Sequence, residues 1–244
     1  MKLTLRSGGG GGRAERPGPI RASAMYRVQE ALGARFTDDA GWRVADVYTS
    51  VDDEIARARS GVGLCDASAC GKLGVRGHAV DSWWPKLTGG PVPAVGRAAW
   101  ERVNGASVLA CRRADDELLL LTPPRDFTAV AGVVEQAAES GGSVHVTDLT
   151  AAFAVVDLIG YKLLALLERL VALDLSAVPP LGVIQGDLAR VHAIMLRLDQ
   201  GIPVFRVLVG REYGDFVWRT LSDAGHDLGL TPVGAAAYSK MMSS

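Results

Sequence analysis

The side chains best able to bind a metal are the four histidines and three cysteines. No pair of them shows an HxH, HExxH or CxxC spacing, and Cys65 and Cys70 are too far apart to chelate one ion as neighbours. We therefore predict no metal site and interpret the cysteines as buried or free thiols of a reducing compartment. The residues concerned are His78, His145, His192, His226, Cys65, Cys70 and Cys111.

Motifs for phosphate binding and nucleophilic catalysis are equally weak. The Gly61-Val-Gly63 segment is followed by Leu64 rather than by the start of a phosphate-binding helix. No GxSxG pattern marks an acyl-transfer serine. The acidic run 115–117 could supply a general base, but it immediately precedes the apolar run 118–121, which favours a solvated turn before a strand. None of these patterns identifies a catalytic residue.

Composition sets the broad class of the protein. The chain has 244 residues with a formal net charge of −1, 48% hydrophobic residues and 22% charged residues, the balance of a soluble globular protein. Near-zero net charge argues against a nucleic-acid or anionic membrane partner. The most apolar region, 149–175, contains five charged residues, whereas a spanning helix needs roughly 18 or more consecutive apolar residues. We expect a cytoplasmic protein.

The first elements along the chain can be placed from local signals. Residues 1–24 form a Gly/Arg/Pro-rich segment with five consecutive glycines at 8–12, which we expect to be a disordered tail preceding a folded domain at 25–244. Ser50 followed by Asp53 predicts a capped helix start, and Gly61 predicts its end. The pair Trp83-Trp84 favours core packing, with a partner surface as the alternative for one indole.

Comparison of the chain with itself reveals a repeat. The segments 66–77 and 148–160 both run from an Asp through a hydroxyl residue into a strand pattern that ends in glycine, about 82 positions apart. Arg125 and Arg211 each open an amphipathic helix further on. In the second of these helices we predict a buried stripe. Its members are Tyr213, Phe216, Val217 and Leu221.

These repeats predict an α+β fold made of two similar ferredoxin-like α/β halves, at about 26–145 and 146–244. Each half is expected to hold a small sheet with antiparallel strands and helices on one face. Neither half is large enough to stand alone, so we expect the two to share a core.

The segment Tyr48–Gly77 resembles the N-terminal signature of the glycine-cleavage T-protein (aminomethyltransferase) superfamily, which includes the folate domains of sarcosine and dimethylglycine oxidases. Its helix, its Val-Gly-Leu-x-Asp-x-Ser segment and its Gly-Lys strand occur in order. The resemblance extends over roughly residues 26–235. It implies two halves packed together as in the T-protein folate-binding domain, without the C-terminal barrel of full T-proteins.

Two departures from the family pattern concern the folate site. The chain runs from Asn104-Gly-Ala106 straight into a strand, with no room for the family's segment that carries a catalytic Asp. In the stretch Leu198–Arg206, the family's pterin-binding Glu is replaced by Arg206 and its Tyr by Asp199. A carboxylate accepts hydrogen bonds from the pterin edge whereas a guanidinium only donates, so the resemblance implies loss of the usual folate pocket.

The shortened, motif-poor sequence is most similar to the gamma subunit of heterotetrameric sarcosine oxidases. That resemblance implies a non-catalytic subunit of a heteromeric sarcosine or N-methyl amine oxidase linked to one-carbon metabolism. It also implies no cofactor on this chain, with flavins, NAD and tetrahydrofolate carried by flavin-containing partner subunits. The alternative is a stand-alone tetrahydrofolate-dependent aminomethyl or one-carbon transferase with a rearranged pocket. Its candidate ligand groups are Asn104, Arg197, Asp199 and Arg206.

Overall fold

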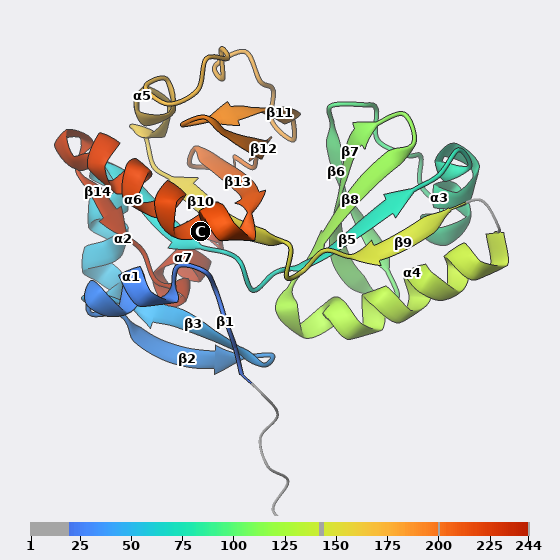
Figure 1. Ribbon diagram of the computed structural model, residues 1–244, viewed down its shortest axis with the longest axis horizontal. Helices are drawn as coiled ribbons and strands as arrows, with labels where there is room; N and C mark the ends of the chain where they lie inside the picture. Colours follow the sequence, from blue (N-terminus) through green and yellow to red (C-terminus); the bar gives the residue numbers. More distant parts are fainter. Residues whose placement is uncertain (1–19, 142–143, 200, 244) are drawn as a thin grey trace, which may run out of the picture.

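A computed structural model describes residues 20–141, 144–199 and 201–243, whose strands form three sheets (Figure 1). The five-stranded sheet has the order β6 (Ala98–Val103), β7 (Ala106–Ala114), β8 (Glu117–Thr122), β5 (Gly71–Arg76) and β9 (His145–Asp148). The six-stranded sheet has the order β11 (Val183–Leu188), β12 (Val191–Arg197), β13 (Val204–Gly210), β10 (Phe153–Ile159), β4 (Val62–Asp66) and β14 (Leu230–Pro232). The third sheet has the order β1 (Arg21–Ala22), β3 (Trp42–Val47) and β2 (Arg35–Asp39).

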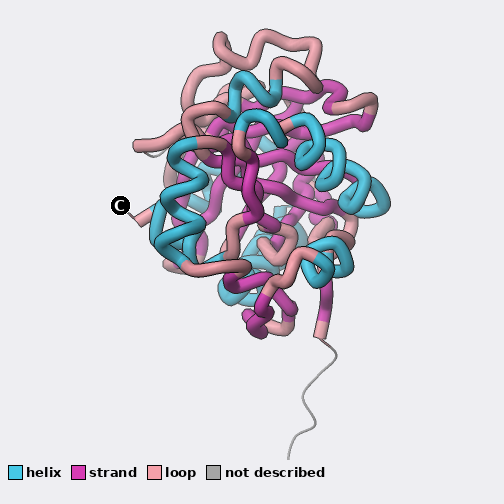
Figure 2. The backbone as a smooth tube through the Cα atoms, turned by 90° about the vertical axis from the view of Figure 1, so that its left-hand side faces the viewer, coloured by secondary structure: helices cyan, strands magenta, loops and turns pink. Residues whose placement is uncertain are grey.

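Most helices lie on the outer faces of the two larger sheets, and the tube view in Figure 2 shows helices on both sides of the strands. Two helices, α3 (Val80–Thr88) and α4 (Phe127–Gly141), pack against the five-stranded sheet. Three more, α1 (Tyr26–Ala31), α5 (Leu163–Leu167) and α6 (Gly214–Ala224), pack against the six-stranded sheet. The remaining α-helices are α2 (Val51–Ser60) and α7 (Ala235–Met242), and single 3-10 turns occur at Pro124–Asp126, Arg211–Tyr213 and His226–Leu228.

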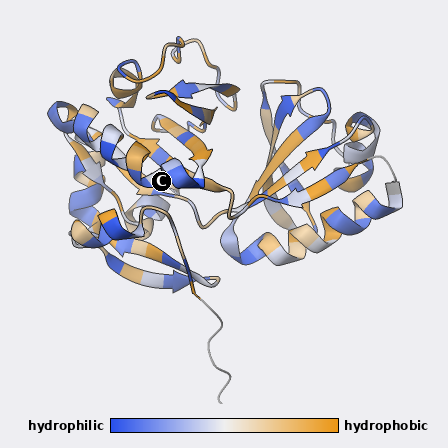
Figure 3. Cartoon of the chain, in the orientation of Figure 1, coloured by the Kyte–Doolittle hydropathy of each residue, from blue (hydrophilic) through white to orange (hydrophobic). Residues whose placement is uncertain are grey.

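The four leucines of β8 show why the layers pack in this way. Leu118 and Leu120 contribute to the core beneath α3 and α4, whereas Leu119 and Leu121 contribute to a core shared with the six-stranded sheet. Alternate residues of a strand point to opposite faces, so an unbroken apolar run requires burial on both. The result is an α/β/β/α arrangement, and Figure 3 shows hydrophobic residues along the strands of both larger sheets.

The two halves exchange a strand. Although β4 directly precedes β5 in the chain, it pairs with β10, with Asp66 opposite Val156. Correspondingly, β9 precedes β10 but pairs with β5, with Asp148 opposite Leu73. The predicted fold of two similar packed halves with a shared core is confirmed. The exact repeat limits at 26–145 and 146–244 stay a prediction, because β9 spans the limit between 145 and 146 and because β4 and β9 are exchanged between the sheets.

Local predictions had mixed outcomes. Ser50 Oγ accepts a hydrogen bond from the Asp53 amide at 3.2 Å, which confirms the capped start of α2. The predicted stripe of α6 is wrong in part, because Tyr213 and Phe216 are 45% and 49% exposed. The chain makes a 3-10 turn at Arg211–Tyr213 before α6 begins, which shifts the phase of the helix. The residues of α6 that are buried are Gly214, Val217, Trp218 and Leu221.

Three further expectations can be placed on the structure. Trp83 and Trp84 are both buried, so neither indole forms an exposed partner surface. Residues 1–19 of the predicted tail lie outside the described residues, whereas Arg21–Ala22 pair in parallel with β3, ahead of the predicted domain start at Met25. Of the helices in the described ranges, none has the length and apolar character needed to cross a membrane.

Candidate functional site

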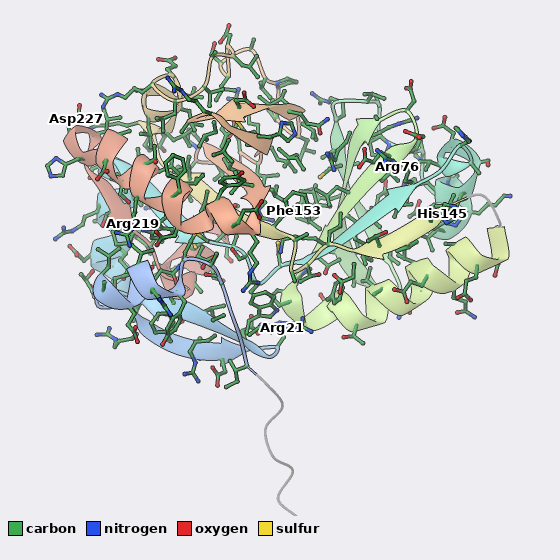
Figure 4. The ribbon with its side chains drawn as sticks, viewed as in Figure 1. Arg21, Arg76, His145, Phe153, Arg219 and Asp227 are labelled. Atoms are coloured by element: carbon green, nitrogen blue, oxygen red, sulfur yellow. The ribbon has the colours of Figure 1, made fainter. Side chains whose placement is uncertain are left out.

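A cavity of about 290 Å³ opens where the two larger sheets and the small N-terminal sheet meet. The loop that follows β4 forms one wall, the end of β8 forms another, and β13 and α7 close the floor. In Figure 4, Phe153 at the start of β10 marks where the chain crosses between the larger sheets. The lining residues are Asp39, Val44, Cys65, Asp66, Ala67, Ala69, Cys70, Trp100, Leu121, Thr122, Pro123, Pro124, Arg206, Ala235 and Tyr238.

The floor of the cavity holds a buried ion pair between neighbouring strands. Arg206 on β13 lies opposite Asp157 on β10 in the sheet register. Arg206 Nε donates to Asp157 Oδ1 at 2.8 Å, and Arg206 Nη2 donates to Asp157 Oδ2 at 2.7 Å. The Asp157 side chain is fully buried and that of Arg206 is 15% exposed. Burial opposes the charge of Arg206, but the adjacent carboxylate outweighs it and raises the pKa of the guanidinium above its ordinary value.

A phenol and two thiols near this pair are shifted towards their neutral forms. Burial, followed by the negative charge of Asp157, raises the pKa of the Tyr238 phenol well above its ordinary value. Burial also raises the pKa of the Cys65 and Cys111 thiols. Because the thiolate is the reactive form of cysteine, these two side chains have the character of core residues rather than of nucleophiles. Cys70, which also lines the cavity, is half-buried.

Asp66, a second carboxylate on the cavity wall, is already engaged by protein donors. It accepts hydrogen bonds from the Ser23 hydroxyl, from Gln29 Nε2 at 2.8 Å and from the Ser68 amide at 2.9 Å. Thr122, on the opposite wall, donates its hydroxyl to the Pro123 carbonyl at 3.1 Å. These side chains therefore stabilise the wall and leave little capacity for a ligand.

A buried lysine anchors the same wall from behind. Lys72 is fully buried, and its Nζ donates to the carbonyl oxygens of Ser68 at 2.8 Å, Cys70 at 2.8 Å and Thr150 at 3.1 Å. Burial lowers the pKa of this ammonium group. Three carbonyl oxygens satisfy the three donors of the ammonium, which ties the loop after β4 to the chain between β9 and β10.

Of the four ligand groups predicted under the transferase alternative, the structure places only Arg206 on the cavity. Asn104 lies exposed in the turn between β6 and β7 with a φ of 51°. Arg197 Nε donates to Asp199 Oδ2 at 2.6 Å and Arg197 Nη1 donates to the Val178 carbonyl at 2.7 Å, while Asp199 Oδ1 accepts from the Val204 amide at 3.1 Å. The four residues are not brought together.

Sequence reasoning missed Asp157, Lys72 and Tyr238. A signal for the first was present, because Asp157 interrupts an otherwise apolar strand run at 153–159 and Arg206 interrupts the run at 204–210. Two opposite charges, each in an otherwise apolar strand, are expected to pair when those strands are neighbours. Lys72 and Tyr238 carry no comparable signal, since their partners are backbone carbonyls or come from distant elements.

The layered architecture and the two similar packed halves are those of a T-protein-like domain. Residues 25–242 match the model of the GCVT N-terminal domain, and the chain belongs to that family. The recognition of this family from the sequence is thereby confirmed.

The relatives and the solved structures agree with this placement. An aminomethyltransferase of Saccharopolyspora erythraea is 24% identical, matching 88% of this chain and 60% of its own length. One of Rubrobacter xylanophilus is 28% identical, matching 85% and 58%. The chain thus spans about three fifths of the length of these curated relatives.

Two solved structures share the fold. The aminomethyltransferase T of the Bartonella henselae glycine cleavage system superposes with a TM-score of 0.81 at 18% identity, covering 91% of this chain and 62% of that one. A chain of the heterotetrameric sarcosine oxidase of Corynebacterium sp. U-96 superposes with a TM-score of 0.64 at 20% identity, covering 87% and 98%. At these identities the likeness establishes the fold.

Proposed function

We propose that this chain is a non-catalytic T-protein-like subunit of a heteromeric oxidase acting on sarcosine or a related N-methyl amine. In this proposal the flavins, NAD and tetrahydrofolate belong to the partner subunits, and this chain contributes a folded domain that binds them through protein contacts. The observation that carries the proposal is the buried Asp157–Arg206 pair on the cavity floor.

With this pair in place, the cavity floor lacks the hydrogen-bond acceptor that a pterin edge needs. The family resemblance places a pterin-binding carboxylate at the position of Arg206, and a guanidinium cannot accept the donors of a pterin edge. Asp157 cannot replace that carboxylate, because it is fully buried and both its oxygens accept from Arg206. Breaking the pair to free the carboxylate would leave a buried cation without a partner, at a cost of about 3–5 kcal/mol.

The other carboxylates of the cavity do not compensate. Asp66 accepts hydrogen bonds from Ser23, Gln29 and the Ser68 amide. Asp39 lies at the rim, 36% exposed and 3.8 Å from Arg125. An acid in that exposed position is screened by water and adds little to binding. The described lining residues therefore support a cavity that does not hold tetrahydrofolate in the family's manner.

A subunit role is supported by the fold comparison and by the surface. The sarcosine oxidase chain that superposes is covered over 98% of its length, so in that heterotetramer this fold occupies one whole chain. On the present chain, Tyr213 and Phe216, three positions apart at the start of α6, have exposed aromatic side chains. Exposed aromatic side chains are enriched at protein interfaces.

Two measurements test the proposal. Titration of the purified chain with tetrahydrofolate under reducing, oxygen-free conditions is expected to show no saturable binding up to about 1 mM, which corresponds to a binding free energy weaker than about −4 kcal/mol. Affinity capture of the chain from its native cell is expected to recover flavin-containing subunits in stoichiometric amounts. Micromolar tetrahydrofolate binding, or a chain that remains alone in the native extract, would contradict it.

The stand-alone tetrahydrofolate-dependent transferase is the second candidate. Two observations favour it: the curated relatives are aminomethyltransferases, and the superposition on aminomethyltransferase T has the higher TM-score of the two. Replacement of Asn104, Arg197, Asp199 and Arg206 by alanine tests it. Tetrahydrofolate-dependent turnover should fall in the variants, with thermal unfolding followed in parallel to detect loss of fold. Wild-type rates in all four variants would remove those residues from the assignment.

A further inference from the structure

The edge of Arg206 that Asp157 does not occupy gives the cavity a binding group of its own. Nε and Nη2 both donate to the carboxylate of Asp157. The remaining nitrogen, Nη1, has no acceptor among the described residues, and it is not one of the buried polar atoms sealed from solvent. Because Arg206 lines the cavity, this nitrogen is an available donor at its floor.

The ion pair also fixes the orientation of that donor. Two parallel hydrogen bonds hold the guanidinium plane in one position, so a ligand would not have to order a long flexible side chain. The charge of Arg206 is balanced by Asp157, which makes a neutral acceptor as compatible with the cavity as an anionic one.

The rest of the cavity surface is largely apolar. Leu121, Pro123 and Pro124 form one side, and Val44 and Ala235 face it from other elements. At the rim, Trp100 is 47% exposed, which leaves a large indole surface in contact with water. Aromatic side chains bind flat rings by offset stacking or edge contact, so the rim favours a planar ligand body. A volume of about 290 Å³ lies at the lower end of small-molecule sites.

We propose that this cavity binds a flat, mostly apolar small molecule through an oxygen acceptor, a carboxylate or carbonyl group, that takes hydrogen bonds from the free edge of Arg206. The ring of the ligand lies against Trp100. A molecule that can only donate is disfavoured at the floor, because the Asp157 and Asp66 carboxylates accept from protein donors and the third lining carboxylate, Asp39, lies at the water-exposed rim. This inference goes beyond the proposed subunit role and does not depend on it.

Three probes of similar size distinguish the type of polar group that the cavity recognises. They are benzoate, benzamide and benzylamine. Benzoate and benzamide present oxygen acceptors, with and without charge, whereas benzylamine presents only donors at neutral pH. Binding is measured by ligand-observed NMR on the full chain. Acrylamide quenching of tryptophan fluorescence reports the location, because Trp100 is the exposed indole while Trp42, Trp83, Trp84 and Trp218 are buried. Benzoate or benzamide should bind and protect Trp100, and benzylamine should do neither.

Variants then assign the contacts. Arg206→Lys replaces the planar donor edge by a point charge and should weaken benzoate or benzamide binding about tenfold. The double variant Asp157→Leu/Arg206→Met removes both members of the pair, so it keeps the site measurable if the single variant is unstable. Trp100→Ala should weaken binding about fivefold, and Phe216→Ala, an exposed aromatic residue on α6, should leave it unchanged.

The outcomes that overturn the proposal are equally specific. Benzylamine binding as tightly as benzoate and benzamide would show that the acceptor is not recognised. Unchanged affinity in Arg206→Lys and in the double variant would remove the guanidinium from the site. Absence of binding by every probe at about 10 mM, a level that detects binding free energies of only about −3 kcal/mol, would show that the cavity holds no such ligand. None of these results bears on subunit capture, and tetrahydrofolate binding is measured by its own titration.

Discussion

Ser68 and Thr150 accept equivalent hydrogen bonds across the two halves of the molecule. The Val155 amide donates to Ser68 Oγ at 3.0 Å, and the Lys72 amide donates to Thr150 Oγ1 at 3.1 Å. Each hydroxyl residue stands two positions after the aspartate that begins its repeat, and each aspartate accepts the amide of its own hydroxyl residue, at 2.9 Å and 2.8 Å. The repeat in the sequence therefore encodes a reciprocal connection between the halves.

Loss of either hydroxyl should weaken both halves together. Ser68 and Thr150 are each 3% exposed, so Ser68→Ala or Thr150→Val leaves a buried amide without its acceptor. We expect each variant to lower the free energy of unfolding by about 1–2 kcal/mol in urea titrations. Thr150→Ser keeps the hydroxyl and is the matched control, with less than half of that loss. A separate early transition of one half would contradict a shared, reciprocal connection.

The buried ion pair should show strong coupling between its members. Asp157→Ala and Arg206→Ala each leave one uncompensated charge in the core, and each should cost about 3–5 kcal/mol. The double variant Asp157→Leu/Arg206→Met leaves no charge behind and should cost much less than the sum of the two, as measured by a double-mutant cycle in urea. Additive losses would show that the two side chains do not act as one buried unit.

The features predicted correctly are those that depend on residues close together in the chain. The cap of α2 involves Ser50 and Asp53, three positions apart, and it is present as expected. The repeat was visible because both copies keep the pattern that begins at Asp66 and Asp148. The exchange of β4 and β9 was not predictable in the same way, because the order of strands along the sequence does not determine which sheet each strand joins.

What could not be predicted depends on distant contacts. Asp157 and Arg206 are 49 positions apart, and only the register of β10 and β13 shows that they face each other. Glu54 stands in the first turn of α2, yet it is buried and accepts from the amides of Tyr48 at 2.6 Å and Gly234 at 2.8 Å. The buried face of α6 was predicted wrongly in part because a 3-10 turn precedes the helix.

Lys72 should make stability depend on alkaline pH. Burial lowers the pKa of Lys72 in the folded chain below its ordinary value of 10.5. Between these two values the unfolded chain binds more protons than the folded one, so the free energy of unfolding contributed by Lys72 rises with pH up to about 10.5 and is constant above it. Lys72→Met removes this dependence. The contributions of the other titrating groups are the same in both proteins and cancel when the two pH curves are subtracted. The difference between wild type and variant should therefore increase as pH rises through this window, and parallel curves would contradict the buried charge.

Gly160, between β10 and α5, should tolerate no side chain. Its φ of +131° is one that residues with a Cβ rarely adopt, and an added Cβ would lie 2.3 Å from the Ala58 carbonyl oxygen and 2.7 Å from that of Gly61. Both contacts are with backbone at the end of α2, which cannot move aside without disturbing the core. Gly160→Ala should therefore lower the free energy of unfolding by about 3 kcal/mol or more.

Gly105 is the matched control for the Gly160 variant. It has a φ of +80° in the exposed turn between β6 and β7, and an added Cβ there meets nothing within 4 Å. Gly105→Ala should cost about 1 kcal/mol, the strain of the left-handed conformation alone. The excess loss in Gly160→Ala then measures the steric contact with α2 separately from backbone strain. Equal losses in the two variants, measured in the same urea titrations, would show that α2 can shift to admit a methyl group and that this junction between the halves is less rigid than its geometry indicates.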